Sequence, residues 1–124
     1  MSKNQTILII DDIEENVDIL ERQLMAADFN VLSANEGPKG LHILKKERVD
    51  LVLLDINMPI VDGITLLKSI KEDKSIAHIP VIMVTANDDA KMVMTCLKKG
   101  ACGYITKPYS MKQIKQQIEH CFKS

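Results

Sequence analysis

Five short apolar runs recur along the chain, and each is separated from the next by a segment long enough to hold a helix. Several runs are continuously apolar, which is typical of parallel strands covered by helices on both faces. We therefore expect strands at residues 7–10, 31–34, 51–54, 81–84 and 102–106.

The segments after these runs carry apolar residues at helical spacing. Pro38 can open the second helix, Gly100 can cap the end of the fourth, and Ser110 with Gln113 forms a capping box before the fifth. Five strand–helix repeats predict an α/β three-layer sandwich with right-handed crossovers. The expected buried stripes are Ile13, Val17, Leu20 and Leu24; Leu41 and Leu44; Ile64, Leu67 and Ile70; Ala90, Val93, Met94 and Leu97; and Met111, Ile114, Ile118 and Phe122.

The length of 124 residues predicts a single domain, 1–124, with a core at about 5–122. Sixteen basic and seventeen acidic residues nearly balance, which argues against a general nucleic-acid binder. No apolar run is long enough to span a bilayer or to form a signal peptide, so we expect no membrane association and a cytoplasmic protein. Three cysteines without a CxxC motif predict reduced thiols and no zinc site.

Polar and charged side chains stand where the central strands should end. Asp11 and Asp12 follow the first run, Asp55 the third, Thr85 the fourth and Lys107 the fifth. Open parallel sheets bind ligands beyond the carboxyl ends of their strands. Taken singly, each Asp or Thr could be a helix cap and the lysine a solvated side chain, but their convergence on one edge favours a site.

Carboxylates packed together require a cation or must hold protons. Mg²⁺ suits a set of oxygen donors, and Ca²⁺ is second because no EF-hand loop is present. The same group suits phosphoryl transfer, in which Asp55 is the nucleophile while Lys107 and Thr85 contact the phosphoryl oxygens.

With these residues in place, the chain resembles the receiver domain of two-component signalling, especially the single-domain chemotaxis regulators. The motifs are Asp11-Asp12, the segment LVLLDINMPIVDG around Asp55, Thr85-Ala86 and Lys107-Pro108. The resemblance covers nearly the whole chain. It implies a flavodoxin-like receiver fold, with a five-stranded parallel sheet in the order 2-1-3-4-5 and five helices.

The resemblance also implies roles for individual residues. Asp55 is the phosphoacceptor; Asp12, Asp55 and the backbone carbonyl of Asn57 bind Mg²⁺, and Asp11 holds a metal-bound water. The phosphate-binding and switch residues that it implies are Thr85, Ala86, Lys107, Asn57 and Tyr104, the last as the switch aromatic.

Two finer expectations concern geometry and kinetics. A cis Lys107-Pro108 bond would aim the lysine inward. Asn57 stands two residues after Asp55, and Asn87 stands two residues after Thr85. In the family, the side chains at these two positions flank the path of the water that hydrolyses the phosphoryl group. Neither side chain is a carboxylate, so we expect slow to moderate loss of phosphate, accelerated by Asn87→Glu.

The expected function is a phosphorylation-controlled binding switch rather than an enzyme. Its donor would be a sensor histidine kinase or a histidine phosphotransfer protein, and its downstream protein target is unknown. Receivers of dimerising transcription factors resemble one another in acid–arginine pairs across the fourth and fifth helices. This chain has no arginine after Arg48, so we expect a monomer. The alternatives are a receiver cut from a hybrid kinase or multidomain regulator and, more remotely, a Mg²⁺-dependent aspartyl phosphatase; a flavin or nucleotide binder is disfavoured by the acidic loop DDIEEN.

Overall fold

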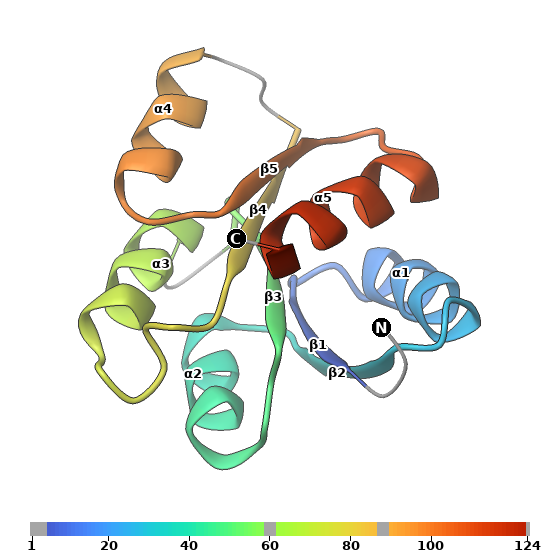
Figure 1. Ribbon diagram of the computed structural model, residues 1–124, viewed down its shortest axis with the longest axis horizontal. Coiled ribbons are helices and arrows are strands. Elements are labelled where there is room, and N and C mark those ends of the chain that lie inside the picture. Colours follow the sequence, from blue (N-terminus) through green and yellow to red (C-terminus); the bar gives the residue numbers. More distant parts are fainter. Residues whose placement is uncertain (1–4, 59–61, 87–89, 124) are drawn as a thin grey trace.

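The computed structural model describes residues 5–58, 62–86 and 90–123. Within these residues five strands alternate with five helices along the chain (Figure 1). Their bounds are β1 (Thr6–Ile10), α1 (Glu14–Ala26), β2 (Asn30–Ala34), α2 (Gly37–Lys46), β3 (Leu51–Asp55), α3 (Gly63–Glu72), β4 (Val81–Thr85), α4 (Ala90–Lys98), β5 (Gly103–Thr106) and α5 (Met111–Lys123).

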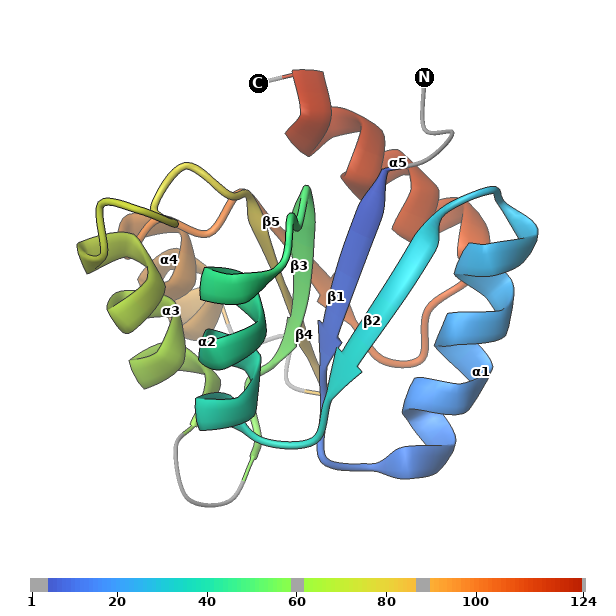
Figure 2. The same ribbon diagram turned by 90° about the horizontal axis from the view of Figure 1, so that it is seen from below.

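All neighbouring strands are parallel, in the order β2-β1-β3-β4-β5, which confirms the predicted sheet. Helices α1 and α5 cover one face, and α2, α3 and α4 cover the other (Figure 2). The chain goes from β1 to β2 on one side and then from β2 to β3 on the other side of β1, so the direction of the connections reverses between β1 and β3. The carboxyl ends of β1 and β3 therefore lie side by side, which is where open α/β sheets bind ligands.

The continuous apolar runs divide between the two faces of the sheet. Ile7 and Ile9 pack with α1 and α5, whereas Leu8 and Ile10 pack with the helices on the other face. Side chains of a strand point alternately to opposite faces, so a strand covered on both sides must be apolar at every position. This packing accounts for the burial of β3 and β4 along their full length.

Local signals for helix ends are confirmed. The Ser110 backbone N–H donates to Gln113 Oε1 at 2.8 Å, and the Gln113 N–H donates to Ser110 Oγ at 3.2 Å. Pro38 lies in the first turn of α2. Gly100 follows α4 with a φ of 106°, a left-handed conformation that glycine adopts without steric cost.

The predicted buried face of α4 is wrong. Met94 and Leu97 are 52% and 42% exposed, whereas Cys96 is fully buried and Met92 packs against the core. Apolar residues occur on nearly every side of this helix, so hydrophobicity alone does not determine its rotation. Ile13 of the α1 stripe is also 48% exposed, at the position before the helix begins.

The expectation of three reduced thiols is also wrong. Cys102 and Cys121 form a disulfide with their Cα atoms 5.8 Å apart, and Cys96 is free and buried. Cys102 lies just before β5, and Cys121 lies in the last turn of α5, which runs back along the sheet. The two residues meet only through this fold, so the spacing of the cysteines in the sequence could not reveal the pair. No helix in the described ranges has the length and apolar character needed to cross a membrane.

Candidate functional site

The predicted site residues gather at the carboxyl edge of the sheet. Asp11 follows β1, Asp55 and Thr85 are the last residues of β3 and β4, and Lys107 follows β5. The strand register aligns these ends, because Asp55 pairs with Val84 and Thr85 pairs with Thr106. The parallel sheet thus brings together side chains from four separate segments.

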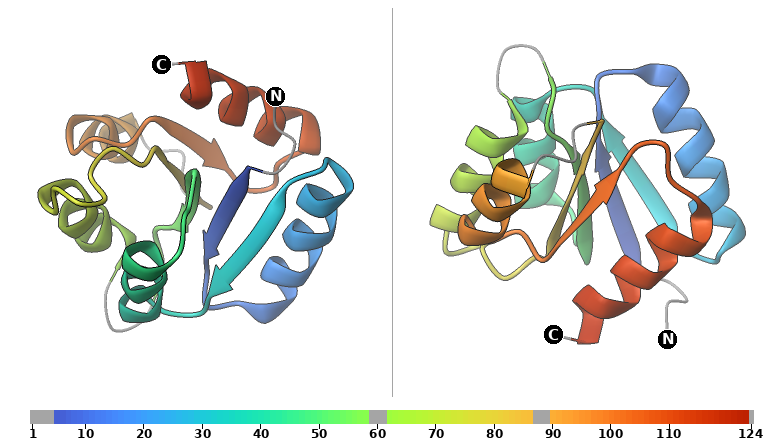
Figure 3. Two further views of the ribbon diagram at one scale, coloured as in Figure 1. Left: turned by 60° about the horizontal axis from the view of Figure 1, so that its bottom comes forward. Right: turned by 90° about the horizontal axis from the view of Figure 1, so that it is seen from above.

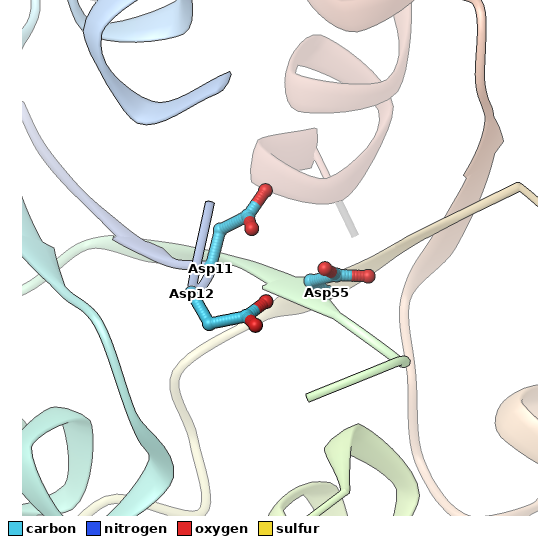
Figure 4. Close-up of side chains that lie close together, drawn as sticks. All are labelled: Asp11, Asp12 and Asp55. Atoms are coloured by element: carbon cyan, nitrogen blue, oxygen red, sulfur yellow. The ribbon is translucent and has the colours of Figure 1, made fainter. Parts of the chain in front are cut away.

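Three carboxylates lie together at this edge. One oxygen from each of Asp11, Asp12 and Asp55 falls within 4.8 Å of the others, and Figure 4 shows the three side chains close together. Asp11 and Asp55 are only 7% and 4% exposed, whereas Asp12 is exposed. The cluster therefore combines two buried anions with one that faces solvent.

Lys107 supplies a positive charge beside the two buried carboxylates. Its Nζ lies 3.8 Å from Asp11 Oδ2 and 3.8 Å from Asp55 Oδ2. Its backbone N–H donates to the Thr85 carbonyl at 2.7 Å, which attaches the lysine loop to the end of β4. The Lys107-Pro108 bond is cis, as expected.

Asp55 is an unusual acid. Burial and, to a lesser degree, the negative charge of Asp11 raise its pKa, Lys107 and the Asn57 N–H lower it, and the net result is a pKa of about 6. The Asn57 N–H donates to Asp55 Oδ1 at 3.2 Å. The raised pKa shows that one ammonium group and one N–H do not offset burial and the neighbouring carboxylate.

Asp11 also has a local backbone role. Its Oδ1 accepts a hydrogen bond from the Ile13 N–H at 2.9 Å, which supports the turn into α1. Its Oδ2 remains directed to Lys107. Asp11 therefore combines a turn-stabilising contact with its place in the carboxylate cluster.

A glycine allows α3 to begin directly against the end of β3. The Gly63 N–H donates to the Ile56 carbonyl at 2.8 Å. A Cβ at Gly63 would lie 2.6 Å from Ile56 Cα and would also overlap the Asp55 carbonyl oxygen. Any larger residue would push α3 away from the backbone that carries Asp55.

The remaining predicted residues occupy several positions around this edge. Thr85 is fully buried, Ala86 and Asn57 are exposed, and Tyr104 is half-buried against the α2–α3–α4 side of the core. Asn87 lies outside the described residues, so its expected kinetic role stays a prediction.

Sequence reasoning missed Tyr109. Burial raises the pKa of its hydroxyl, and the charges of Asp11 and Asp55 raise it further. The ring packs with the α1–α5 side of the core while its hydroxyl senses both carboxylates. In the sequence, only its position two residues after Lys107 could have indicated that Tyr109 lies near the site. A tyrosine at that position could equally be a residue that packs in the core.

The donor set fits a hard divalent cation. The three carboxylates offer only oxygen ligands, which hard cations prefer. Their negative charges repel one another, and a bound cation would relieve that repulsion. Burial and the nearby charge of Asp11 both raise the pKa of Asp55, so a bound cation would favour the ionised form of this carboxylate. Such a cluster resembles the magnesium site of receiver domains.

Comparison with known proteins agrees with this geometry. The model of the response regulator receiver domain matches residues 7–119. Chemotaxis protein CheY-3 of Vibrio cholerae is 36% identical over 123 residues, covering 98% of this chain and 95% of that protein. Response regulator PleD of Caulobacter vibrioides is 40% identical over 102 residues, which cover 82% of this chain but only 22% of PleD.

A solved structure shares the fold. The receiver domain of sensor histidine kinase PA1611 from Pseudomonas aeruginosa superposes with a TM-score of 0.88 at 24% identity, covering 98% of this chain and 99% of that one. That structure has a magnesium ion coordinated in its active-site cleft. From the match over residues 7–119 and the near full-length similarity to a chemotaxis regulator, the chain belongs to the response regulator receiver domain family.

Proposed function

We propose that the protein is a signalling switch that accepts a phosphoryl group on Asp55 from a phosphohistidine of a sensor histidine kinase or phosphotransfer protein. One observation carries the proposal. Asp55 is a 4% exposed carboxylate at a strand end, grouped with Asp11 and Asp12 and contacted by Lys107. A phosphoacceptor requires this combination of nucleophile, metal ligands and cation.

Asp12, Asp55 and the backbone carbonyl of Asn57 would hold Mg²⁺, and Asp11 would hold a metal-bound water. The PA1611 receiver carries magnesium in its active-site cleft, and the oxygen donors here suit the same ion. When bound, Mg²⁺ would neutralise the carboxylates and balance charge on the phosphoryl oxygens. In its absence the proton affinity of Asp55 is raised, which weakens the carboxylate as a nucleophile.

The transfer step uses groups from separate strand ends. An Asp55 Oδ attacks the phosphorus, and the P–N bond to the donor histidine breaks with its electron pair returning to the imidazole. Lys107 is near enough to turn its ammonium from the Asp55 carboxylate toward a phosphoryl oxygen. The Thr85 hydroxyl and the Ala86 N–H would donate to the other oxygens, since Thr85 ends β4 and Ala86 follows it.

The response would travel from Thr85 to Tyr104. Thr85 is the last residue of β4, and Tyr104 lies on the adjacent strand, half-buried against the core. Movement of Thr85 toward the phosphate would favour an inward position of the Tyr104 ring and change the surface formed by α4 and β5. Phosphorylation would thus shift the population between two arrangements that a downstream protein distinguishes.

The phosphate should be lost slowly to moderately, because Asn57 does not offer a carboxylate to orient water and Asn87 has the same side chain. The chain would act as a phosphoacceptor and not as an enzyme with a separate substrate. Its near full-length match to CheY-3 favours a single-domain regulator, while its match to part of PleD keeps a receiver within a larger protein as the alternative.

The proposal is tested with acetyl phosphate and Mg²⁺, with intact mass spectrometry detecting one added phosphoryl group. Wild type should gain the group, and Asp55→Asn should not. Asp50→Asn is the matched control, because Asp50 lies near the opposite edge of the sheet and hydrogen-bonds Thr6. Modification of Asp55→Asn to the wild-type level, or none of wild type in repeated trials with beryllofluoride as a second probe, would refute the phosphoacceptor role.

A further inference from the structure

The Cys102–Cys121 pair lies at the edge of the sheet opposite Asp55. Cys102 directly precedes β5, and Cys121 lies in the last turn of α5. Figure 3 shows α5 crossing one face of the sheet, with its C-terminal end toward the edge at which the parallel strands begin. The bond closes a segment that contains all of β5, Lys107 and most of α5.

The surroundings of the pair can hold both redox states. Cys121 is 4% exposed and continues the buried stripe of Ile114 and Ile118 on α5. Cys102 is half-buried and packs against the same cluster. Because a reduced cysteine behaves as a small apolar residue, the dithiol can occupy this position without repacking the core.

A surface pocket lies against both cysteines. Its volume is about 340 Å³, and its lining includes both cysteines, His78, Pro80 and Asp50. Cys96 provides the contrast, since it is fully buried on the other face of the sheet and burial raises its thiol pKa. A small reagent therefore reaches the pair more readily than the free cysteine.

We propose that Cys102 and Cys121 form a reversible dithiol–disulfide site that reacts with low-molecular-weight disulfides and thiols. In oxidation, the Cys102 thiolate attacks one sulfur of the small disulfide and displaces one thiolate. The Cys121 thiolate then attacks the Cys102 sulfur and displaces the second. Two small thiols are released, and they carry the two protons that the cysteines lose.

Cys102 is the entry point because it is the more exposed of the two sulfur-bearing residues. In the reverse direction an incoming thiolate attacks the Cys102 sulfur and releases Cys121 into its buried stripe. A second thiolate attacks the mixed disulfide and frees Cys102. The site thus needs no bound cofactor and is separate from the carboxylates around Asp55.

The disulfide controls how firmly α5 is held on the sheet. When the bond is closed, the end of α5 cannot separate from the start of β5, and the unfolded chain also loses conformational freedom. When the bond is open, this covalent link is lost and the last turn of α5 depends on non-covalent contacts such as the packing of Phe122 against the core. The oxidised protein should therefore melt about 10 °C higher than the reduced protein.

The test equilibrates wild type in buffers of graded ratios of reduced to oxidised glutathione. Alkylation traps free thiols, and mass spectrometry assigns them to individual cysteines. Cys102 and Cys121 should change state together over a midpoint within the series, while Cys96 stays reduced throughout. A pair that remains fully oxidised or fully reduced across the series would overturn the proposal.

Matched variants separate the pair from general thiol effects. Cys96→Ser should keep both the redox transition and the shift in melting temperature, whereas Cys121→Ser should lose both. If a variant fails to fold, the wild-type alkylation series and its two melting temperatures still decide the matter; equal melting temperatures would refute the effect on α5. Phosphorylation by acetyl phosphate, measured in both states, tests the Asp55 site separately.

Discussion

Two partly buried lysines at opposite edges of the sheet behave differently. Near the amino edge, Lys71 Nζ donates to the carbonyls of Ala77 and Ile79 at 2.9 and 2.7 Å. At the carboxyl edge, Lys107 Nζ stands 3.8 Å from each of two carboxylates. Short hydrogen bonds to backbone carbonyls hold Lys71 in place. Lys107 makes longer contacts with two carboxylates, which carry the same charge and repel each other. The first lysine is thus fixed by backbone carbonyls, whereas the second lies among charged groups that can take part in chemistry.

Removing the lysine at the reactive edge should have the largest effect. We expect Lys107→Met to slow phosphorylation by acetyl phosphate about tenfold to a hundredfold, because a charge-assisted hydrogen bond to the phosphoryl group is lost. Rates are measured by intact mass spectrometry. Lys112→Met, on the exposed side of α5, is the control and should react at the wild-type rate. Equal rates for the two variants would remove Lys107 from the mechanism.

The backbone beneath the reactive edge should tolerate no added atom. Gly63→Ala places a Cβ 2.6 Å from Ile56 Cα, and backbone cannot move aside cheaply, so we expect a loss of about 3 kcal/mol in the free energy of unfolding. Gly40→Ala is the matched change, because the three atoms nearest to its added Cβ all belong to the Ile10 side chain and not to backbone. Urea unfolding should show the smaller loss for Gly40→Ala; the reverse order would contradict this account.

The charge on Asp55 should reduce stability in metal-free protein. Its folded-state pKa of about 6 lies above the ordinary 3.8, so the folded protein binds the extra proton between these values. Stability should therefore fall as the pH rises from about 4 to 6 and stay lower above that range. At neutral pH Asp55→Asn should add about 2 kcal/mol, since it removes the buried charge.

Melting curves at pH 5 and pH 7.5 measure this effect. The gain from Asp55→Asn should be larger at pH 7.5, and Mg²⁺ should reduce it by stabilising wild type selectively. A gain that is independent of both pH and Mg²⁺ would show that the buried charge is not its cause.

At the amino edge, loss of one backbone hydrogen bond should lower the free energy of unfolding more than loss of an exposed ion pair. Asp50 Oδ2 accepts from the Thr6 N–H at 2.8 Å, so Asp50→Ala should cost about 1 kcal/mol. Arg48, whose side chain is 91% exposed, lies 3.7 Å from Asp50 Oδ1, and Arg48→Ala should change stability very little. Urea unfolding compares the two variants. A larger effect of Arg48→Ala would mean that the ion pair, and not the backbone contact, secures this edge.

The sequence by itself determined the order of strands and helices and the residues at the carboxyl edge. Apolar runs identify buried strands because side-chain alternation and burial are local consequences of the chain. Asp55 and Thr85 could be assigned to strand ends for the same reason. The capping box of Ser110 and Gln113 likewise depends on residues three apart.

Only the tertiary structure decided which side of α4 is buried, how the cysteines pair and where the Tyr109 hydroxyl lies. Met94 and Cys96 are both plausible core residues until the sheet and its neighbouring helices select one face. Cys102 and Cys121 meet only because α5 returns across the sheet. The raised pKa of Asp55 requires burial together with Asp11 from another strand end. These features arise from contacts between segments far apart in the chain, which periodicity and spacing do not encode.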